Sequence, residues 1–163
     1  MRRLKHLLTK ILEVVVAAMV AIMVLVVLWG VISRFVISMS SPWTEEVATH
    51  LLAWVALLGA AVGFSQKQHL GVDFLYNKLH PASQRTLAII VQLLVILFAF
   101  CVMVWGGTAL VGKTLAIGQV TPTLNIPMGY VYLSVPVSGL FIMLFSFEQI
   151  YEIYKNHPCK RSY

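Results

Sequence analysis

The chain has 163 residues, of which 60% are hydrophobic and only 11% are charged. Soluble domains have about 45–50% apolar and about 25% charged residues, and one of this length buries only about 70% of its unfolded-chain surface. The remaining apolar surface therefore has to face lipid, so the lipid bilayer is the first predicted partner. The formal charge of +6 comes from basic residues that lie between apolar runs, which argues against nucleic acid as a partner.

The first apolar run comprises residues 14–33 and follows a basic leader. As a helix, a run of this length spans about 30 Å, the thickness of the hydrocarbon core. A cleavable signal peptide is the alternative, but its apolar region normally has only about 7–15 residues. We therefore expect a retained membrane helix.

A second helix is predicted to begin near Pro42. A proline in the first turn, a serine before it and the acidic pair Glu45 and Glu46 after it are typical of a helix N-terminus. The membrane part of this helix is expected at residues 47–66, which contain no Asp, Glu, Lys or Arg.

The following segment, residues 67–85, is more polar. Val72 and Leu79 lie on one face at helical spacing, while Asp73 lies on the other, which is typical of a short amphipathic helix in the membrane interface. We expect such a helix, ended by Pro81, and a plain polar loop is the alternative.

Two further uncharged runs, residues 86–112 and 128–147, predict the third and fourth membrane spans. Between them, glycine and proline residues beginning at Gly118 predict an irregular loop. Pro136 is expected to kink the fourth helix, because proline removes one backbone hydrogen bond from a helix interior.

The distribution of Lys and Arg predicts the orientation in the membrane. All but two of these residues lie in the leader, the middle segment and the C-terminal tail, and the two exceptions are Arg34 and Lys113. Because cytoplasmic loops are enriched in Lys and Arg, we expect both termini in the cytoplasm. The predicted fold is a single all-α membrane domain, residues 1–163, with four transmembrane helices.

Ionisable residues at membrane depth mark functional sites, because placing a charge in lipid costs at least about 2.5–3.5 kcal/mol. His50 is the only His, Asp, Glu, Lys or Arg within the four predicted spans. The spans have no carboxylate to exchange protons and no pair of histidines to hold haem. The sequence therefore predicts no catalytic residue, no cofactor and no metal site.

Glu45 and Glu46 form the one acidic pair near a membrane boundary. Two carboxylates are able to share a cation, but the sequence offers no third ligand. Helix capping together with an ion pair to Arg34, which ends the preceding helix on the same side, is the favoured interpretation.

Four other residues are candidates for packing or partner contact. Trp43 and Trp54 are suited to anchoring at the polar boundary or to filling helix contacts. Gly59 and Gly63 form a GxxxG motif that allows a second helix to approach closely. That second helix could belong to this chain or to a partner.

Taken in order, these residues resemble the small membrane subunit, called DctQ-type, of TRAP (tripartite ATP-independent periplasmic) transporters. The resemblance covers nearly the whole chain. It rests on Arg34-Phe35, the Pro42 to Glu46 segment, Trp54, Gly59-Ala60, Gly63, His69, Val72, Asp73, Pro122, Ile126-Pro127, Tyr130 and the Pro136 to Gly139 segment.

The resemblance implies a subunit role. In this family a periplasmic substrate-binding protein captures an organic acid, such as a C4-dicarboxylate, sialic acid or another sugar acid, and a large DctM-type subunit moves it across the inner membrane with sodium. We expect this chain to be a non-catalytic scaffold that holds the large subunit, with outer loops at residues 34–46 and 113–127 helping to dock the binding protein. An independent small transporter or channel is the alternative, and a membrane enzyme is a weaker one.

Overall fold

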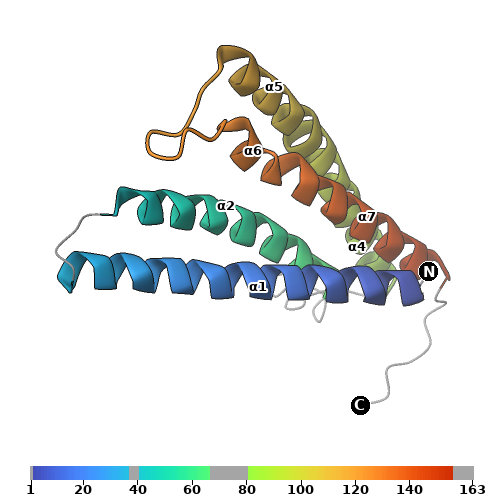
Figure 1. Ribbon diagram of the computed structural model, residues 1–163. Helices are drawn as coiled ribbons and strands as arrows, with labels where there is room; N and C mark the ends of the chain where they lie inside the picture. Colours follow the sequence, from blue (N-terminus) through green and yellow to red (C-terminus); the bar gives the residue numbers. More distant parts are fainter. Residues whose placement is uncertain (1, 37–40, 67–80, 156–163) are drawn as a thin grey trace.

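The computed structural model describes residues 2–36, 41–66 and 81–155. Within these ranges the chain is almost entirely helical, and β structure is limited to one isolated bridge between Val120 and Pro127. The elements are α1 (Arg2–Phe35), α2 (Pro42–Ser65), α4 (Pro81–Phe98), the π-helix η1 (Ala99–Gly106), α5 (Gly107–Ile117), α6 (Gly129–Tyr132) and α7 (Ser134–Lys155) (Figure 1). The prediction of an all-α chain is confirmed.

Four helical stretches are long and apolar enough to cross a membrane, as predicted. They are His6–Phe35, Pro42–Ser65, Leu87–Ile117 and Gly129–Tyr151. Each includes most of one predicted span and continues beyond at least one of its ends, because the helical turns extend past the apolar run.

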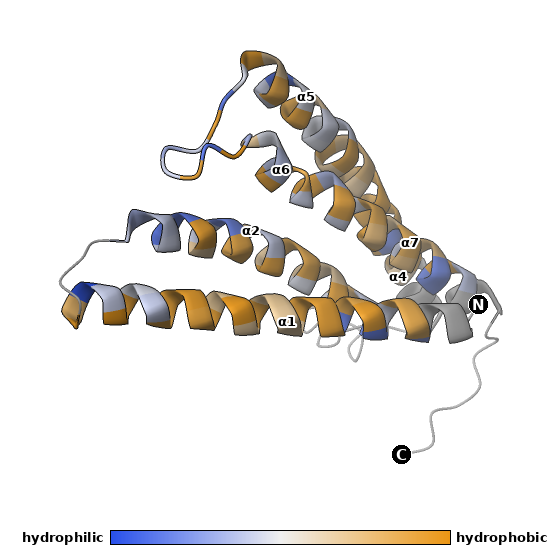
Figure 2. Cartoon of the chain, in the orientation of Figure 1, coloured by the Kyte–Doolittle hydropathy of each residue, from blue (hydrophilic) through white to orange (hydrophobic). Residues whose placement is uncertain are grey.

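Apolar side chains cover the outside of the molecule. Figure 2 shows hydrophobic residues along almost the whole length of α1, with hydrophilic residues concentrated near its ends. Only 6% of the most hydrophobic window of α1 is buried inside the chain. Lipid or a partner must therefore cover the rest, since large exposed apolar patches mark such contacts.

The helices form two hairpins, one of α1 and α2, the other of α4 through α7. Figure 1 shows the start of α1 and the end of α7 at the same end of the molecule, where the hairpins meet. We call this the inner end. Toward the opposite, outer end the two hairpins diverge.

A small hydrophobic core joins the hairpins. Its buried members are Leu12 of α1, Leu58 and Ala61 of α2, and Phe145 of α7. A hydrogen bond adds to this contact, because the Gln149 Nε2 donates to the backbone carbonyl of Phe64 at 3.0 Å. The contact between the two hairpins therefore combines apolar packing with a hydrogen bond from the buried Gln149 side chain.

The third span is one continuous helix through α4, η1 and α5, and α7 packs closely against it. A Cβ atom added at Gly139 would lie 2.7 Å from the Met103 Cβ of η1. One added at Gly107 would lie 2.9 Å from the Pro136 Cδ of α7. Glycine is therefore required at both positions for the helices to approach at backbone distance.

The fourth span is interrupted at Leu133, between α6 and α7. The break lies one turn before Pro136, which has no N–H to donate to the carbonyl of Tyr132. The Leu133 N–H still donates to the Gly129 carbonyl and the Val137 N–H to the Leu133 carbonyl, so the helical ladder continues across this position and the kink at Pro136 stays a prediction. The predicted loop is present, because α5 ends at Gly118, whose φ is +67°.

The predicted interfacial helix lies mostly outside the described residues, and so does Asp73. Pro81, which was expected to end that helix, is instead the first residue of α4. Proline is well suited to a first helical turn, where its missing N–H would have no helical partner. The third helix therefore starts earlier than the predicted span at residue 86.

Candidate functional site

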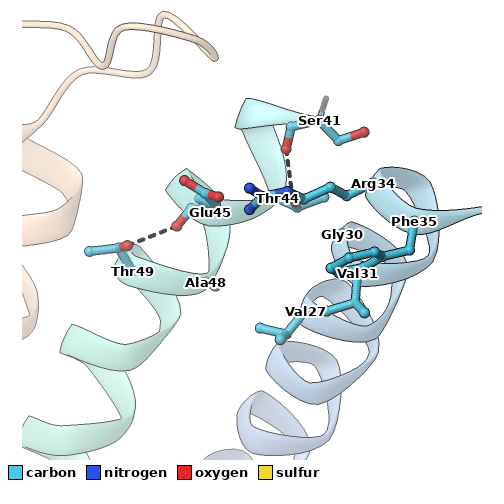
Figure 3. Close-up of a pocket in the computed structure, with 10 residues that line it drawn as sticks. All are labelled: Val27, Gly30, Val31, Arg34, Phe35, Ser41, Thr44, Glu45, Ala48 and Thr49. Carbon is cyan, nitrogen blue, oxygen red and sulfur yellow. Dashed lines mark hydrogen bonds between the residues drawn. The ribbon is translucent and has the colours of Figure 1, made fainter. Parts of the chain in front are cut away.

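One cluster of polar groups lies at the outer end of the described chain. Here α1 and α2 enclose an open pocket with a volume of about 740 Å³ (Figure 3). Its polar wall includes Arg34 of α1, Ser41, and Thr44 and Glu45 of α2. We call it the outer pocket.

The base of the outer pocket is a close contact between α1 and α2. A Cβ atom added at Gly30 would lie 2.7 Å from the Thr44 Oγ1, so glycine allows this approach. Thr44 is buried, and its hydroxyl donates to the Ser41 carbonyl at 2.7 Å. The hydroxyls of Ser33 and Ser41 are hydrogen bonded at 2.8 Å and join the two helices.

The predicted helix start at Pro42 is confirmed, and the Ser41 side chain before it bonds Ser33 and does not cap the helix. The ion pair predicted beside it is corrected. The expected ion pair between Arg34 and the acidic pair is not formed within the described part of the chain. Figure 3 shows the Arg34 side chain extending from α1 toward the start of α2, and no hydrogen bond joins it to Glu45.

Glu46 has different partners, which explains why it does not pair with Arg34. Its carboxylate oxygens accept hydrogen bonds from the backbone N–H of Thr123 at 2.9 Å and of Leu124 at 3.4 Å. Both donors lie in the outer loop, residues 118–128. Since α2 and this loop belong to different hairpins, Glu46 ties together the diverging outer ends.

The outer loop is itself held by internal hydrogen bonds. The Thr121 N–H donates to the Ile126 carbonyl at 3.0 Å, and the Ile126 N–H donates back to the Thr121 Oγ1 at 3.1 Å. The Met128 N–H donates to the Gln119 carbonyl at 2.9 Å. Asn125 has a φ of 53°, a left-handed conformation that asparagine tolerates in turns. The loop thus presents an ordered backbone to the outer side.

The acidic pair does not form a cation site with other ligands in the described structure. The described residues contain no group of three or more His, Cys, Asp or Glu side chains able to hold a metal ion. The two carboxylates have separate surroundings, because Glu45 lines the outer pocket and Glu46 binds the outer loop. Their adjacency in sequence therefore does not make a shared site.

The tryptophan candidates have different positions. Trp54 is partly buried and packs against the hydrophobic core, so its role within this chain is structural. Trp43 is 38% exposed near the start of α2, a position suited to a membrane boundary.

No described residue outside α2 fills the GxxxG motif of this helix. A Cβ atom added at Gly59 or Gly63 would find no atom within 4 Å apart from the helix's own backbone. Ala56 and Ala60 beside them are exposed. These four residues form what we call the small-residue strip.

Sequence reasoning assigned no contact to Gly30, Thr44, Gly107 or Gly139, although Thr44 and Gly139 lie in segments that carry the family resemblance. Their contacts set the distances between helices. Gly139 lies only three residues after Pro136, which was a candidate, but nothing in the local sequence indicates that η1 lies opposite. Such contacts join residues far apart in the chain, so no local pattern reports them.

A family model and individual relatives assign the chain to the same protein family. The family model described as the DctQ component of tripartite ATP-independent periplasmic transporters matches residues 23–156. A protein of Haemophilus influenzae, named as a TRAP transporter small permease protein, is 29% identical over 142 residues, which cover 87% of this chain and 86% of that protein.

Two further relatives carry more specific names. The sialic acid TRAP transporter small permease protein SiaQ of Vibrio cholerae is 23% identical over 155 residues, 95% of this chain and 88% of that protein. The isethionate TRAP transporter permease protein DctMQ of Oleidesulfovibrio alaskensis is 30% identical over 96 residues, 59% of this chain but only 15% of that longer protein.

The family match includes the second part of α1 from residue 23 on, all of α2 and α7, the third span and the outer loop. The four long apolar helices agree with a multi-pass membrane protein of this family. The chain therefore belongs to the DctQ component family of tripartite ATP-independent periplasmic transporters, as the small permease subunit.

Proposed function

We propose that this chain is a non-catalytic scaffold that holds a large DctM-type subunit in the bacterial inner membrane, with both of its own termini in the cytoplasm. The transporter it serves takes up an organic acid together with sodium and a periplasmic binding protein. The match to one segment of the longer DctMQ permease protein supports a direct association of the small and large parts. The names of the relatives mention sialic acid and isethionate, both organic acids.

The open small-residue strip is the observation that carries this proposal. Elsewhere in the described chain, glycines at helix contacts are filled by the chain's own atoms, as at Gly30, Gly107 and Gly139. On α2, by contrast, Gly59 and Gly63 remain open, although other faces of α2 pack against α1 and α7. Small residues let membrane helices approach closely, so this strip suits a helix of the large subunit.

The scarcity of ionisable residues in the membrane spans favours a scaffold role over transport by this chain alone. An anionic substrate needs positive or N–H groups at membrane depth, and sodium needs several oxygen ligands. Only His50 among the His, Asp, Glu, Lys and Arg residues lies within the spans predicted from sequence. We therefore assign substrate and sodium binding to the large subunit.

Co-purification tests the scaffold proposal. Gly59→Leu and Gly63→Leu each place a bulky side chain in the strip, and we expect recovery of the co-expressed large subunit to fall by about tenfold, equivalent to about 1.4 kcal/mol. Gly112→Leu is the matched control, because Gly112 on α5 is also open. Equal recovery with all three variants would remove the strip as the contact, and a wild-type chain that never co-purifies would contradict the scaffold role.

We also propose that the outer loop contributes to docking of the binding protein. Its backbone is ordered by the Glu46 contacts and lies at the end of the chain opposite the predicted cytoplasmic termini. Glu46→Lys removes both acceptors, so we expect weaker association of the binding protein and slower uptake with unchanged recovery of the large subunit. Unchanged uptake and association would exclude the loop from docking.

A further inference from the structure

The outer pocket has a polar end and an apolar end. Arg34 and Glu45 lie at its outer side, whereas Val27 of α1 lies about 10 Å deeper along the helix. Val27 and Val31 are each nearly half exposed, so this wall faces lipid rather than the protein interior. The volume of about 740 Å³ is within the usual range for sites that bind small molecules.

The charges of the pocket are opposite and do not neutralise one another directly. Arg34 comes from α1 and Glu45 from α2, and Figure 3 shows both side chains at the pocket with no hydrogen bond between them. A guanidinium binds a phosphate through two parallel hydrogen bonds. A carboxylate accepts hydrogen bonds from an ammonium group. The pair therefore matches a ligand that carries a phosphate and an amine side by side.

We propose that the outer pocket binds a phospholipid whose headgroup carries a primary amine, with its phosphate on Arg34, its ammonium on Glu45 and an acyl chain along Val27 and Val31. The site discriminates by hydrogen bonding and charge. A choline headgroup has no N–H to donate to Glu45, and a glycerol headgroup brings no positive charge to it. The expected order of binding is phosphatidylethanolamine, then phosphatidylcholine, then phosphatidylglycerol.

A lipid fits the outer pocket better than a helix of a partner protein. The α1 wall between Val27 and Phe35 is only about two turns long, and its outer boundary is charged. A membrane-spanning partner helix would contact a longer and more uniformly apolar surface, such as the small-residue strip. This inference does not depend on the scaffold role, because it concerns only α1 and α2 of this chain.

Lipid retention by the full-length chain in its complex with the large subunit tests the inference. The complex is purified in mild detergent, incubated with equal amounts of the three phospholipids and analysed by native mass spectrometry. Wild type is expected to retain phosphatidylethanolamine in preference to the other two. Arg34→Gln should lower its retention about three- to tenfold, since charge-assisted bonds at a partly exposed site are lost.

Glu45→Gln should remove the preference for phosphatidylethanolamine over phosphatidylcholine while leaving phosphate binding intact. Lys113→Gln is the control, because Lys113 is an exposed cation on α5 outside the outer pocket and should leave retention unchanged. Equal retention of the three lipids by wild type, or wild-type retention by Arg34→Gln, would overturn the proposal. Selective retention by the small subunit alone that disappears in the complex would identify the large subunit as the occupant and would also overturn it.

Discussion

Substitution of Gly139 by alanine is expected to destabilise the chain because α7 packs on the π-helix η1 without room for a side chain. The added Cβ would lie 2.7 Å from the Met103 Cβ, whereas ordinary contacts begin at 3.4 Å. The Met103 Cβ is fixed by its own backbone and is unable to rotate away. The helices must therefore separate by about 0.7 Å at this point.

The magnitude follows from the cost of overpacking. Extra atoms in a well-packed interior cost about 1–3 kcal/mol, and about 1 kcal/mol shifts the midpoint by roughly 2–4 °C in a chain of this size. Gly139→Ala should therefore lower the thermal unfolding midpoint by about 2–12 °C. Tryptophan fluorescence of the purified chain in mild detergent measures this midpoint.

Two other glycines provide matched comparisons. Gly112→Ala adds the same atom where nothing lies within 4 Å, so its midpoint should be unchanged or slightly higher. The Cβ added by Gly129→Ala meets only the Leu115 side chain, which is able to rotate away. The unfolding midpoint of this variant should therefore lie between those of Gly139→Ala and Gly112→Ala. If Gly139→Ala is as stable as Gly112→Ala, the close packing of α7 on η1 is refuted.

The hydrogen bonds of the outer end give two further predictions. Glu46→Gln weakens the acceptors of the Thr123 and Leu124 N–H groups, so hydrogen exchange of these two amides should accelerate. Glu45→Gln is the control and should leave their exchange rates unchanged. Equal exchange rates in both variants would contradict the assignment of Glu46 as the acceptor. The double variant Ser33→Cys, Ser41→Cys should form a disulfide on mild oxidation, seen as a mobility shift on non-reducing gels. Adding Gly30→Val should lower the yield of this disulfide, because the larger side chain separates α1 from α2.

The membrane spans could be predicted from sequence because their signal is local. A run of about 20 apolar residues has to be helical in lipid, and Pro42 and Gly118 mark boundaries through their own backbone preferences. The same reasoning predicted a kink at Pro136, and the gap between α6 and α7 lies three residues before it. Each of these features depends on residues within one or two turns of one another.

The contacts between helices could not be predicted because they join distant residues. Glu46 binds an amide 77 residues away, so its sequence neighbours suggested Arg34 instead. The glycines show the same limit. The GxxxG motif suggested a close contact at Gly59 and Gly63, but within the described chain the close contacts occur at isolated glycines such as Gly107 and Gly139.

Transport by reconstituted liposomes tests the central claim most directly. Vesicles that contain only this chain should show no uptake of sodium or of an organic acid such as sialic acid above the leak of empty vesicles. Vesicles that contain both membrane subunits, supplied with the binding protein and a sodium gradient, should accumulate the transporter's own substrate. Sodium-dependent accumulation by this chain alone would contradict the account.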